Sequence, residues 1–273
     1  MTFSIVATDG SAWGVAVASK FLGVGAAVPA AAAGVGAIAT QSWANLAYRP
    51  DGLAMLRAGK SASETLDALT AADEHRDQRQ AGIVDRDGNA ATFTGAGCNP
   101  WAGGVTGDCY AIQGNILVGP EVVEAMERAW LASPTGAPLT RRLLAALQAG
   151  DAAGGDRRGR QSAALLVVTP DGGYGGGSDV FADLRVDDHP QPAHELERLL
   201  DMHDIYFGKP DPATLLPLHG DLAGEVRAKL GALGHNHADL DKALAEWAGI
   251  ENYEERLVPG HIDPVVLGKL REA

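Results

Sequence analysis

Thr2 is the residue whose type and position point most directly to chemistry. Its small side chain favours removal of Met1 in the cell, which leaves a hydroxyl and a free α-amino group on one residue. A threonine hydroxyl is a weak nucleophile, and an α-amino group, with a pKa of about 7.7 to 8.0, is a base suited to activating it. The start of the chain therefore predicts an N-terminal threonine nucleophile.

This chemistry requires a rigid first residue, and the sequence predicts a strand there. Two short runs rich in Val, Ile and Ala, at residues 2–7 and 13–19, flank the turn-forming sequence Thr-Asp-Gly-Ser-Ala at 8–12. This pattern predicts a β-hairpin that begins at residue two. Both faces of the two strands carry apolar or small side chains, so we expect the sheet to be covered on both sides.

The expected register of this hairpin brings two more polar residues to the chain start. A loop at residues 9–12 places Thr2 opposite Ser19, with Lys20 beside them. A nearby ammonium lowers the pKa values of the amine and the hydroxyl, which keeps the base neutral. Lys20 is thus predicted to tune the catalytic amine and Ser19 to contact the substrate. A lysine at this position is also typical of a solvated strand end.

Polar residues after two later strands are further candidates for the site. Gln-Gly-Asn at 113–115 ends a predicted strand, so the amide of Asn115 and nearby backbone N–H groups are candidates to stabilise an oxyanion. An ordinary turn explains the same residues equally well. Gln113, and Gln41 after the strand predicted at 35–40, are predicted to contact the substrate. Buried polar residues of a core look the same in sequence.

A Gly-rich, mixed-charge loop at residues 154–160 precedes another predicted strand. In it, Asp156 is a candidate to hold a substrate amine, and Arg157 or Arg160 to hold a carboxylate. A merely solvated loop is the alternative. Cys98 is a rival nucleophile in principle, but no histidine stands near it in sequence, and a packed cysteine explains it better.

Composition and motifs argue against several other classes of function. The formal charge of −13 argues against nucleic-acid partners, because a phosphate backbone requires clustered Lys and Arg. Only two cysteines occur, the first residues do not form a signal peptide, and the most apolar stretch, residues 21–39, fits strands better than a membrane span. The eight histidines are dispersed, and zinc-protease, Cys-x-x-Cys and Walker motifs are missing from the sequence. We therefore expect a cytoplasmic protein with no metal and no organic cofactor.

The order of predicted elements indicates the fold class. Hairpin, helix pair, strands, helix pair and strands follow one another over residues 1–208, which predicts an α+β architecture rather than regular βαβ alternation. The prolines at 210, 212 and 217 predict a rigid linker. Three amphipathic patterns beyond them predict a small helical domain over residues 209–273. A helical extension packed on the main domain is the alternative.

Six segments in this order carry a resemblance to a known family: MTFSIVA (1–7), GVAVASKF (14–21), ATQ (39–41), QGN (113–115), GGDRRGRQSA (154–163) and LRVDDHP (184–190). Together they resemble DUF1028, a bacterial family of unknown function, over about residues 1–208. That family is assigned to the N-terminal nucleophile hydrolase fold, a four-layer αββα sandwich. The resemblance thus implies amide-bond hydrolysis with Thr2 as nucleophile, and it supplies no substrate.

The tail segment EWAGIENYEER (246–256) resembles a peptidoglycan-binding domain appended to some members of that family. The expected lack of an export signal conflicts with this label, and a cytoplasmic muropeptide fragment or a subunit contact would reconcile the two. The predicted function is an amidohydrolase acting on a small-molecule or peptide-like amide. We expect it to have no nucleic-acid or membrane partner, and the sequence does not decide whether it forms a homo-oligomer. The alternative is a non-catalytic protein that binds a metabolite or muropeptide fragment in the same pocket.

Overall fold

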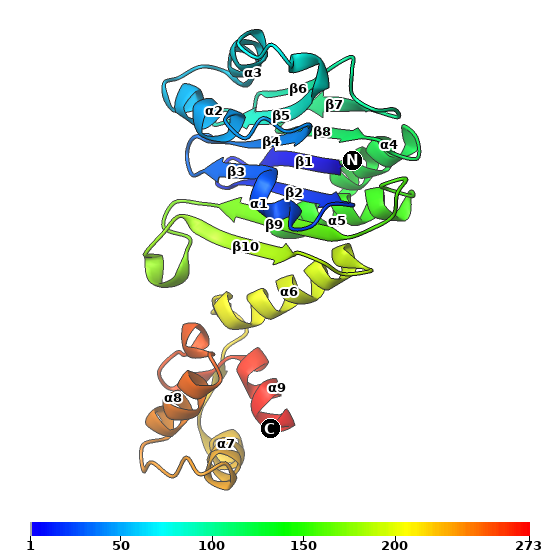
Figure 1. Ribbon diagram of the computed structural model, residues 1–273. Helices are drawn as coiled ribbons and strands as arrows, with labels where there is room; N and C mark the ends of the chain where they lie inside the picture. Colours follow the sequence, from blue (N-terminus) through cyan, green and yellow to red (C-terminus); the bar gives the residue numbers. More distant parts are fainter. Residues whose placement is uncertain (1) are drawn as a thin grey trace. The chain divides into compact units, whose positions relative to one another are not determined.

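The computed structural model describes residues 2–273, which form two compact units (Figure 1). The first ends at Leu199, and the second runs from Leu200 to Ala273. Each unit contains hydrophobic clusters of its own. The sequence places the boundary between residues 208 and 209, whereas the contacts of the chain divide it between Leu199 and Leu200.

The chain begins with a hairpin of β1 (Thr2–Thr8) and β2 (Trp13–Ser19). The Asp9 carboxylate accepts hydrogen bonds from the backbone N–H groups of Ser11 and Ala12, both at 2.9 Å, and the glycine before them has a φ of 88°. These are the turn properties that the sequence predicts. The observed register pairs the first residue of β1 with the last of β2, which confirms the predicted alignment.

The hairpin lies in the middle of a six-stranded antiparallel sheet with the order β10-β9-β2-β1-β8-β7. Two helices pack on one face of this sheet, α4 against β7 and β8, and α5 against β1, β2 and β9. The bounds of these elements are β7 (Gly103–Gly107), β8 (Tyr110–Asn115), α4 (Glu121–Ala132), α5 (Leu139–Ala152), β9 (Ser162–Val168) and β10 (Val180–Val186).

A second antiparallel sheet has the order β3-β4-β5-β6 and is covered by α2 and α3 (Figure 1). The short helix α1 precedes β3, and a 3₁₀ turn precedes β5. The helix α3 begins with the predicted capping box, in which Ser61 and Glu64 bond reciprocally to each other's backbone N–H groups. The bounds are α1 (Val24–Ala27), β3 (Pro29–Ala32), β4 (Gly36–Ser42), α2 (Tyr48–Arg57), α3 (Ala62–Ala71), η1 (Arg76–Gln78), β5 (Arg79–Asp85) and β6 (Ala90–Thr94).

The two sheets pack face to face through a core of small and β-branched side chains. Val15 and Val17 of the first sheet and Ala37 and Ala39 of the second are fully buried there. Small side chains allow two sheets to approach closely, which explains why Ala is so frequent in these strands. The first unit is therefore mixed α/β with antiparallel sheets and with helices on the outer faces, and the predicted α+β class is confirmed.

Apart from the short helix α1 and the 3₁₀ turns η1 and η2 (Tyr174–Gly176), three elements of this unit are missing from the sequence prediction. β3 is an Ala-rich run that starts at Pro29, and β7 contains three glycines, so neither carries a strand pattern. The third is α6 (Pro192–Phe207), which continues past the end of the first unit. The turn η2 lies in the loop before β10.

The second unit is a small helical region in which all three predicted helices are present. They enclose an apolar core that includes Trp247, Tyr253 and Leu270. Asp239 and Asp263 cap α8 and α9 by accepting backbone N–H hydrogen bonds. The bounds are β11 (Leu216–Pro217), α7 (Gly220–Ala232), α8 (Leu240–Ile250), η3 (Glu254–Arg256), β12 (His261–Ile262) and α9 (Pro264–Glu272).

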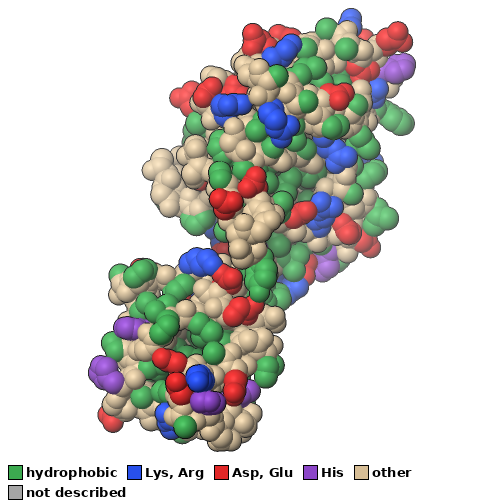
Figure 2. Space-filling model, turned by 90° about the vertical axis from the view of Figure 1, so that its left-hand side faces the viewer, with side chains coloured by type: hydrophobic (Ala, Val, Ile, Leu, Met, Phe, Trp, Pro, Cys, Tyr) green, Lys and Arg blue, Asp and Glu red, His purple; other side chains and the backbone are tan. Residues whose placement is uncertain are grey.

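The distribution of surface charge and the length of the helices concern the two partners that the sequence argues against, nucleic acid and membrane. On the face shown in Figure 2, Lys and Arg side chains are interspersed with Asp and Glu. Among residues 2–273, every helix is too short or too polar to cross a membrane.

Candidate active site

A pocket of about 370 Å³ opens where β1 begins and β2 ends. This volume lies near the lower end of the range for small-molecule sites. The ends of β1, β2 and β4, the helix α1, the loop after β4 and two arginines contribute to its lining. Its polar and aromatic lining residues include Thr2, Ser19, Gln41, Trp43, Arg79 and Arg158.

Thr2 is held at this pocket by both neighbouring strands. It pairs with Ser19 of β2 on one side and with Asn115 of β8 on the other. Its hydroxyl lies 3.0 Å from the Ser19 hydroxyl, and its carbonyl accepts hydrogen bonds from Gln41 Nε2 at 3.3 Å and Asn115 Nδ2 at 3.4 Å. The residue is 6% exposed. A side chain held in this way meets a ligand in one fixed orientation.

A layer of buried polar side chains, four amides and one hydroxyl, lies between the two sheets beside Thr2. We call this layer the amide seam, and it consists of Ser4, Gln41, Gln80, Gln113 and Asn115. All five are 0–1% exposed. Ser4 donates to Gln41 Oε1 at 2.7 Å and accepts from Gln113 Nε2 at 2.6 Å, so the seam connects β1, β4 and β8. Buried polar groups require such partners, and a connected network orders all its members.

Gln80 of β5 is the centre of the amide seam. Its Nε2 donates to the backbone carbonyls of Gly103 at 3.2 Å and Gly114 at 2.7 Å, which sets the orientation of its amide. Its Oε1 then accepts from Gln41 Nε2 and Asn115 Nδ2, both at 2.8 Å. Asn115 therefore turns its nitrogen to Gln80, and its Oδ1 is buried without a hydrogen-bond partner among residues 2–273.

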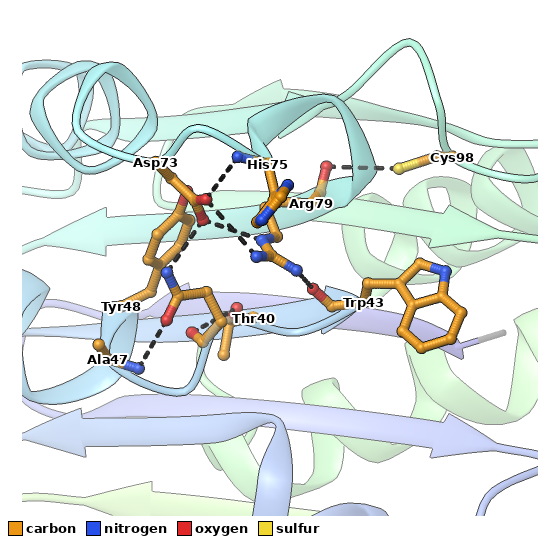
Figure 3. Close-up of polar contacts among 9 residues, drawn as sticks. Thr40, Trp43, Ala47, Tyr48, Asp73, His75, Arg79 and Cys98 are labelled. Carbon is orange, nitrogen blue, oxygen red and sulfur yellow. Dashed lines mark hydrogen bonds and ion pairs between the residues drawn. The ribbon is translucent and has the colours of Figure 1, made fainter.

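Arg79, the first residue of β5, is held at the pocket by Asp73. Arg79 Nε donates to Asp73 Oδ2 at 2.9 Å, and Nη1 donates to the carbonyl of Trp43 (Figure 3). Asp73 Oδ2 also accepts from Asn45 Nδ2 at 2.9 Å and from the Tyr48 hydroxyl at 3.1 Å. The hydrogen bond from Arg79 is the main reason that the pKa of the Asp73 carboxyl lies well below its usual range. Asp73 stays ionised and fixes the direction of the guanidinium.

Arg158 reaches the pocket from the loop between α5 and β9. Its Nη2 donates to the Lys20 carbonyl at 3.0 Å and lies 3.4 Å from Asp156 Oδ2. The Asp156 side chain is 3% exposed and accepts from the backbone N–H groups of Lys20 and Arg158, both at 2.7 Å. A buried carboxylate thus anchors the loop and the guanidinium together.

The rest of the pocket lining is largely apolar. Val24 and Val28 are buried, whereas Phe21, Trp43 and Leu46 are 55%, 66% and 48% exposed. Large apolar side chains exposed around a cavity are typical of a ligand-contact surface. The pocket therefore combines three hydroxyl-bearing residues, two arginines and apolar walls.

Three of the predicted site residues, Thr2, Ser19 and Gln41, line the pocket together. The Lys20 ammonium instead donates to the Arg160 carbonyl at 3.2 Å in an exposed position, and Lys20 is not a lining residue. Asn115 contacts Thr2 but directs its amide nitrogen into the seam. An oxyanion needs a donor, so this orientation gives the predicted oxyanion role of the Asn115 side chain no support.

The other four predicted substrate-binding residues also lie outside the lining. Gln113 is fully buried in the amide seam, and Asp156 holds backbone N–H groups rather than facing the pocket. Arg160 pairs with Asp151 at 2.7 Å, and Arg157 is exposed. The pocket receives their neighbour Arg158 instead, because Asp156 orients the loop in this way.

Arg79, Arg158, Trp43 and Phe21 are pocket residues that the sequence did not single out. Trp43 could have been found from its position two residues after Gln41, because ligand pockets are lined mainly by apolar and aromatic side chains. No local pattern marks Arg79, which follows a helix and a short 3₁₀ turn.

Neither a metal site nor a cysteine site competes with this pocket within residues 2–273. No three His, Cys, Asp or Glu side chains of that range are grouped in a way that would hold a metal ion. Cys98 and Cys109 are free thiols, and Cys98 Sγ donates to the backbone carbonyl of Arg79 at 3.3 Å. Cys98 is not part of the pocket lining.

Two family models match the chain, one over most of the first unit and one within the second. The family model described as "Family of unknown function (DUF1028)" matches residues 2–196. The chain belongs to the DUF1028 family. A second model, described as "Putative peptidoglycan binding domain", matches residues 206–270 of this DUF1028 protein. Both resemblances noted in the sequence are thereby confirmed.

Solved structures similar to this DUF1028 protein include a family member from Silicibacter pomeroyi. Its sequence is 33% identical, and the alignment covers 82% of this chain and 92% of that one, with a TM-score of 0.67. Anbu (ancestral beta-subunit) from Yersinia bercovieri is 13% identical, with coverages of 73% and 93% and a TM-score of 0.35, too low for any inference. No curated protein matches the chain.

Proposed function

We propose that this protein is an amidohydrolase with Thr2 as its N-terminal nucleophile, built on the αββα sandwich of the N-terminal nucleophile hydrolases. The observation that carries the proposal is the place of Thr2. It is the first residue of a central strand and lines the pocket, and its hydroxyl lies 3.0 Å from the Ser19 hydroxyl. Two helices cover the outer face of each sheet, as the proposed sandwich requires.

In the proposed reaction, the nucleophile and its base both belong to Thr2. The Thr2 amine, freed when Met1 is removed, takes the hydroxyl proton, and Oγ1 attacks the amide carbonyl. The C–N bond breaks, the leaving amine takes the proton, and water hydrolyses the ester to regenerate Thr2. We propose that the Ser19 hydroxyl, which lies 3.0 Å from the Thr2 hydroxyl, turns its proton to the developing oxyanion.

Two features favour a neutral, oriented amine in this scheme. Arg79 and Arg158 line the same pocket as Thr2, and a guanidinium close to an amine favours the neutral form of that amine. We propose that they supply the electrostatic effect that the sequence assigned to Lys20. The Oδ1 atom of Asn115, on the residue paired with Thr2, is a buried acceptor without a partner among the described residues. We propose that it receives a hydrogen bond from the Thr2 amine.

Covalent labelling tests this proposal directly. Protein made in a bacterial cytoplasm is expected to have lost Met1 by intact-mass measurement, and a β-lactone, which acylates hydroxyl nucleophiles, should add once, at Thr2. Peptide mass spectrometry locates the adduct, and heat-unfolded protein is the control for non-specific reaction. Retention of Met1 in protein that still reacts would contradict the α-amino mechanism.

A non-catalytic binding protein is the second candidate, because the mixed apolar and cationic lining also suits a ligand that is never cleaved. Ligand binding without any adduct at Thr2, and without turnover of any amide in a panel, would favour that candidate.

A further inference from the structure

Two arginines line one small pocket. Arg79 begins β5 of the second sheet, and Arg158 lies in the loop before β9 of the first sheet. They are 79 positions apart in the sequence, yet both line the cavity that Thr2 also lines. The lining contains no Asp or Glu among the described residues. The anchoring carboxylates, Asp73 and Asp156, are not lining residues, so the charged side chains that line the pocket are both cations.

Both guanidinium groups are ordered before any ligand arrives. Asp73, which accepts hydrogen bonds from several groups and stays ionised, holds Arg79, while the carbonyl of Trp43 takes a second bond from it. Asp156 and the Lys20 carbonyl hold Arg158. A guanidinium in a fixed direction loses little side-chain entropy on binding, and its planar fork matches a carboxylate.

The same pocket offers apolar surface next to these donors. Phe21, Trp43 and Leu46 are each about half or more exposed, and Val24 and Val28 complete the apolar lining. A ligand that satisfies both kinds of wall carries a carboxylate and an apolar group. Since the pocket also contains the Thr2 hydroxyl, the bond between those two parts lies within reach of a nucleophile.

We propose that the pocket binds N-acyl amino acids, with the carboxylate at Arg158 and Arg79 and an aliphatic or aromatic acyl group against Trp43 and Phe21. This inference rests on the proposed function for its chemical step. Thr2 Oγ1 would form an ester with the acyl carbon, the C–N bond would break, and the amino acid would leave with the proton. Water would then release the carboxylic acid and restore the hydroxyl.

Binding is tested apart from turnover with Thr2→Ala protein and isothermal titration calorimetry. N-phenylacetylglycine is expected to bind about 10- to 100-fold more tightly than its primary amide, because a hydrogen bond to a charged group is lost in the amide. Arg158→Gln, combined with Thr2→Ala, should abolish this preference. Arg128 is an exposed arginine on α4. Arg128→Gln removes the same charge and should leave the preference for the acid unchanged. N-acetylglycine should bind more weakly than the phenylacetyl compound, and Trp43→Ala should reduce that difference.

Equal affinity for the acid and its amide, no binding of either, or a preference that survives Arg158→Gln would overturn the proposed ligand class. Turnover by the wild-type protein, followed as release of the free amino acid, is scored separately. Acid-selective binding without turnover would keep the ligand class and contradict the hydrolase function. If the primary amide of N-phenylacetylglycine were hydrolysed as fast as N-phenylacetylglycine itself, the hydrolase function would be supported and the proposed ligand class contradicted.

Discussion

At the scale of single residues, the position of Thr2 matters more than its type. A buried threonine in a strand is ordinary, but this one begins the strand, contacts Ser19 through its hydroxyl and borders a cavity. Its carbonyl is bonded by two side-chain amides from different sheets. These contacts hold the backbone of Thr2 in place beside the pocket.

Substitution of Thr2 separates the nucleophile from the fold. Thr2→Ala keeps a small first residue and a free amine but lacks the hydroxyl, so hydrolysis should fall by several orders of magnitude. Thr2→Ser keeps the hydroxyl and loses the methyl group that restricts χ1, so part of the activity should remain. The free energy of unfolding should change by about 1 kcal/mol in either variant. Release of amine from an N-acyl amino acid and urea unfolding are the two measurements. Equal activity of the wild type and Thr2→Ala would exclude the nucleophile.

At the scale of elements, the amide seam joins the two sheets next to the site. Gln80 of β5 bonds backbone carbonyls of the facing sheet, and Gln41 of β4 bonds the carbonyl of Thr2. The strand positions around Thr2 therefore depend on bonds between sheets as well as within them. Gly82, next but one to Gln80, has no room for a methyl group, because a Cβ there would lie 2.0 Å from Gln113 Oε1.

Gln80→Leu tests the contribution of the amide seam to stability. Leucine has a similar size but leaves the buried amides of Gln41 and Asn115 without their shared acceptor. The two amide nitrogens keep only bonds of 3.3–3.4 Å to backbone carbonyls, and the carbonyls of Gly103 and Gly114 lose a donor. Each buried polar group that loses a partner costs about 1–3 kcal/mol, so we expect a total loss of about 3 kcal/mol or more. Gln161→Leu, where the side chain makes one exposed bond to Asp188, is the control and should change stability little. Chemical unfolding gives both values, and equal effects would show that the seam adds nothing specific.

The Asp73–Arg79 pair predicts a pH dependence of stability. The hydrogen bond from Arg79 depresses the folded pKa of Asp73, whereas the same carboxyl in the unfolded chain titrates near about 3.9. A depressed pKa means that the pair stabilises the protein above pH of about 4 and that this contribution disappears as the pH falls towards the folded pKa. Asp73→Asn should cost about 3 kcal/mol at pH 7 and progressively less below pH of about 4.

Urea unfolding of the wild type and Asp73→Asn across this pH range measures the difference. Asp183→Asn is the matched control, because Asp183 pairs with Arg185 at an exposed site, where such pairs contribute about 1 kcal/mol or less. A difference for Asp73→Asn that stays constant down to pH of about 2 would contradict the assigned ion pair.

At the scale of the whole molecule, two units with separate cores share one chain. The residues that line the pocket and form the amide seam all precede Leu199. The core of the second unit is built from α7, α8 and α9, and Ile205 and Tyr206 at the end of α6 pack against it. The two units are thus expected to fold independently.

A chain that ends at Gly208 should fold and keep the reactivity of Thr2. Its last helical turn should fray, because Ile205 and Tyr206 lose the core that they pack against. Cooperative thermal unfolding, circular dichroism and labelling by the β-lactone are the measurements. Precipitation of the shortened chain, or loss of cooperative unfolding, would show that the second unit completes the core of the first.

Local features of the sequence determined the elements around Thr2. The turn residues at 8–12 and the apolar runs beside them act over a few positions, so hairpin, register and the Thr2–Ser19 pair were predictable. The capping box of α3 was predictable for the same reason. β3 and β7 lack a strand pattern and were not predictable, because packing against neighbouring strands stabilises their weak sequence preference. α6 does carry a helical pattern, with Ala193, Leu196 and Leu200 buried at three- and four-residue spacing, and the sequence prediction did not include it.

Only the tertiary structure decided which polar side chains share the site. The partner of Thr2 across β8 is 113 positions away, and Gln80 reaches both sheets, because strand order and sheet packing bring distant segments together. Among the three arginines at 157, 158 and 160, the middle one lines the pocket, because Asp156 is buried and bonds the loop's backbone. The hydrogen-bond partners of a carboxylate such as Asp156 depend on the fold around it, and the types of the neighbouring residues do not determine them.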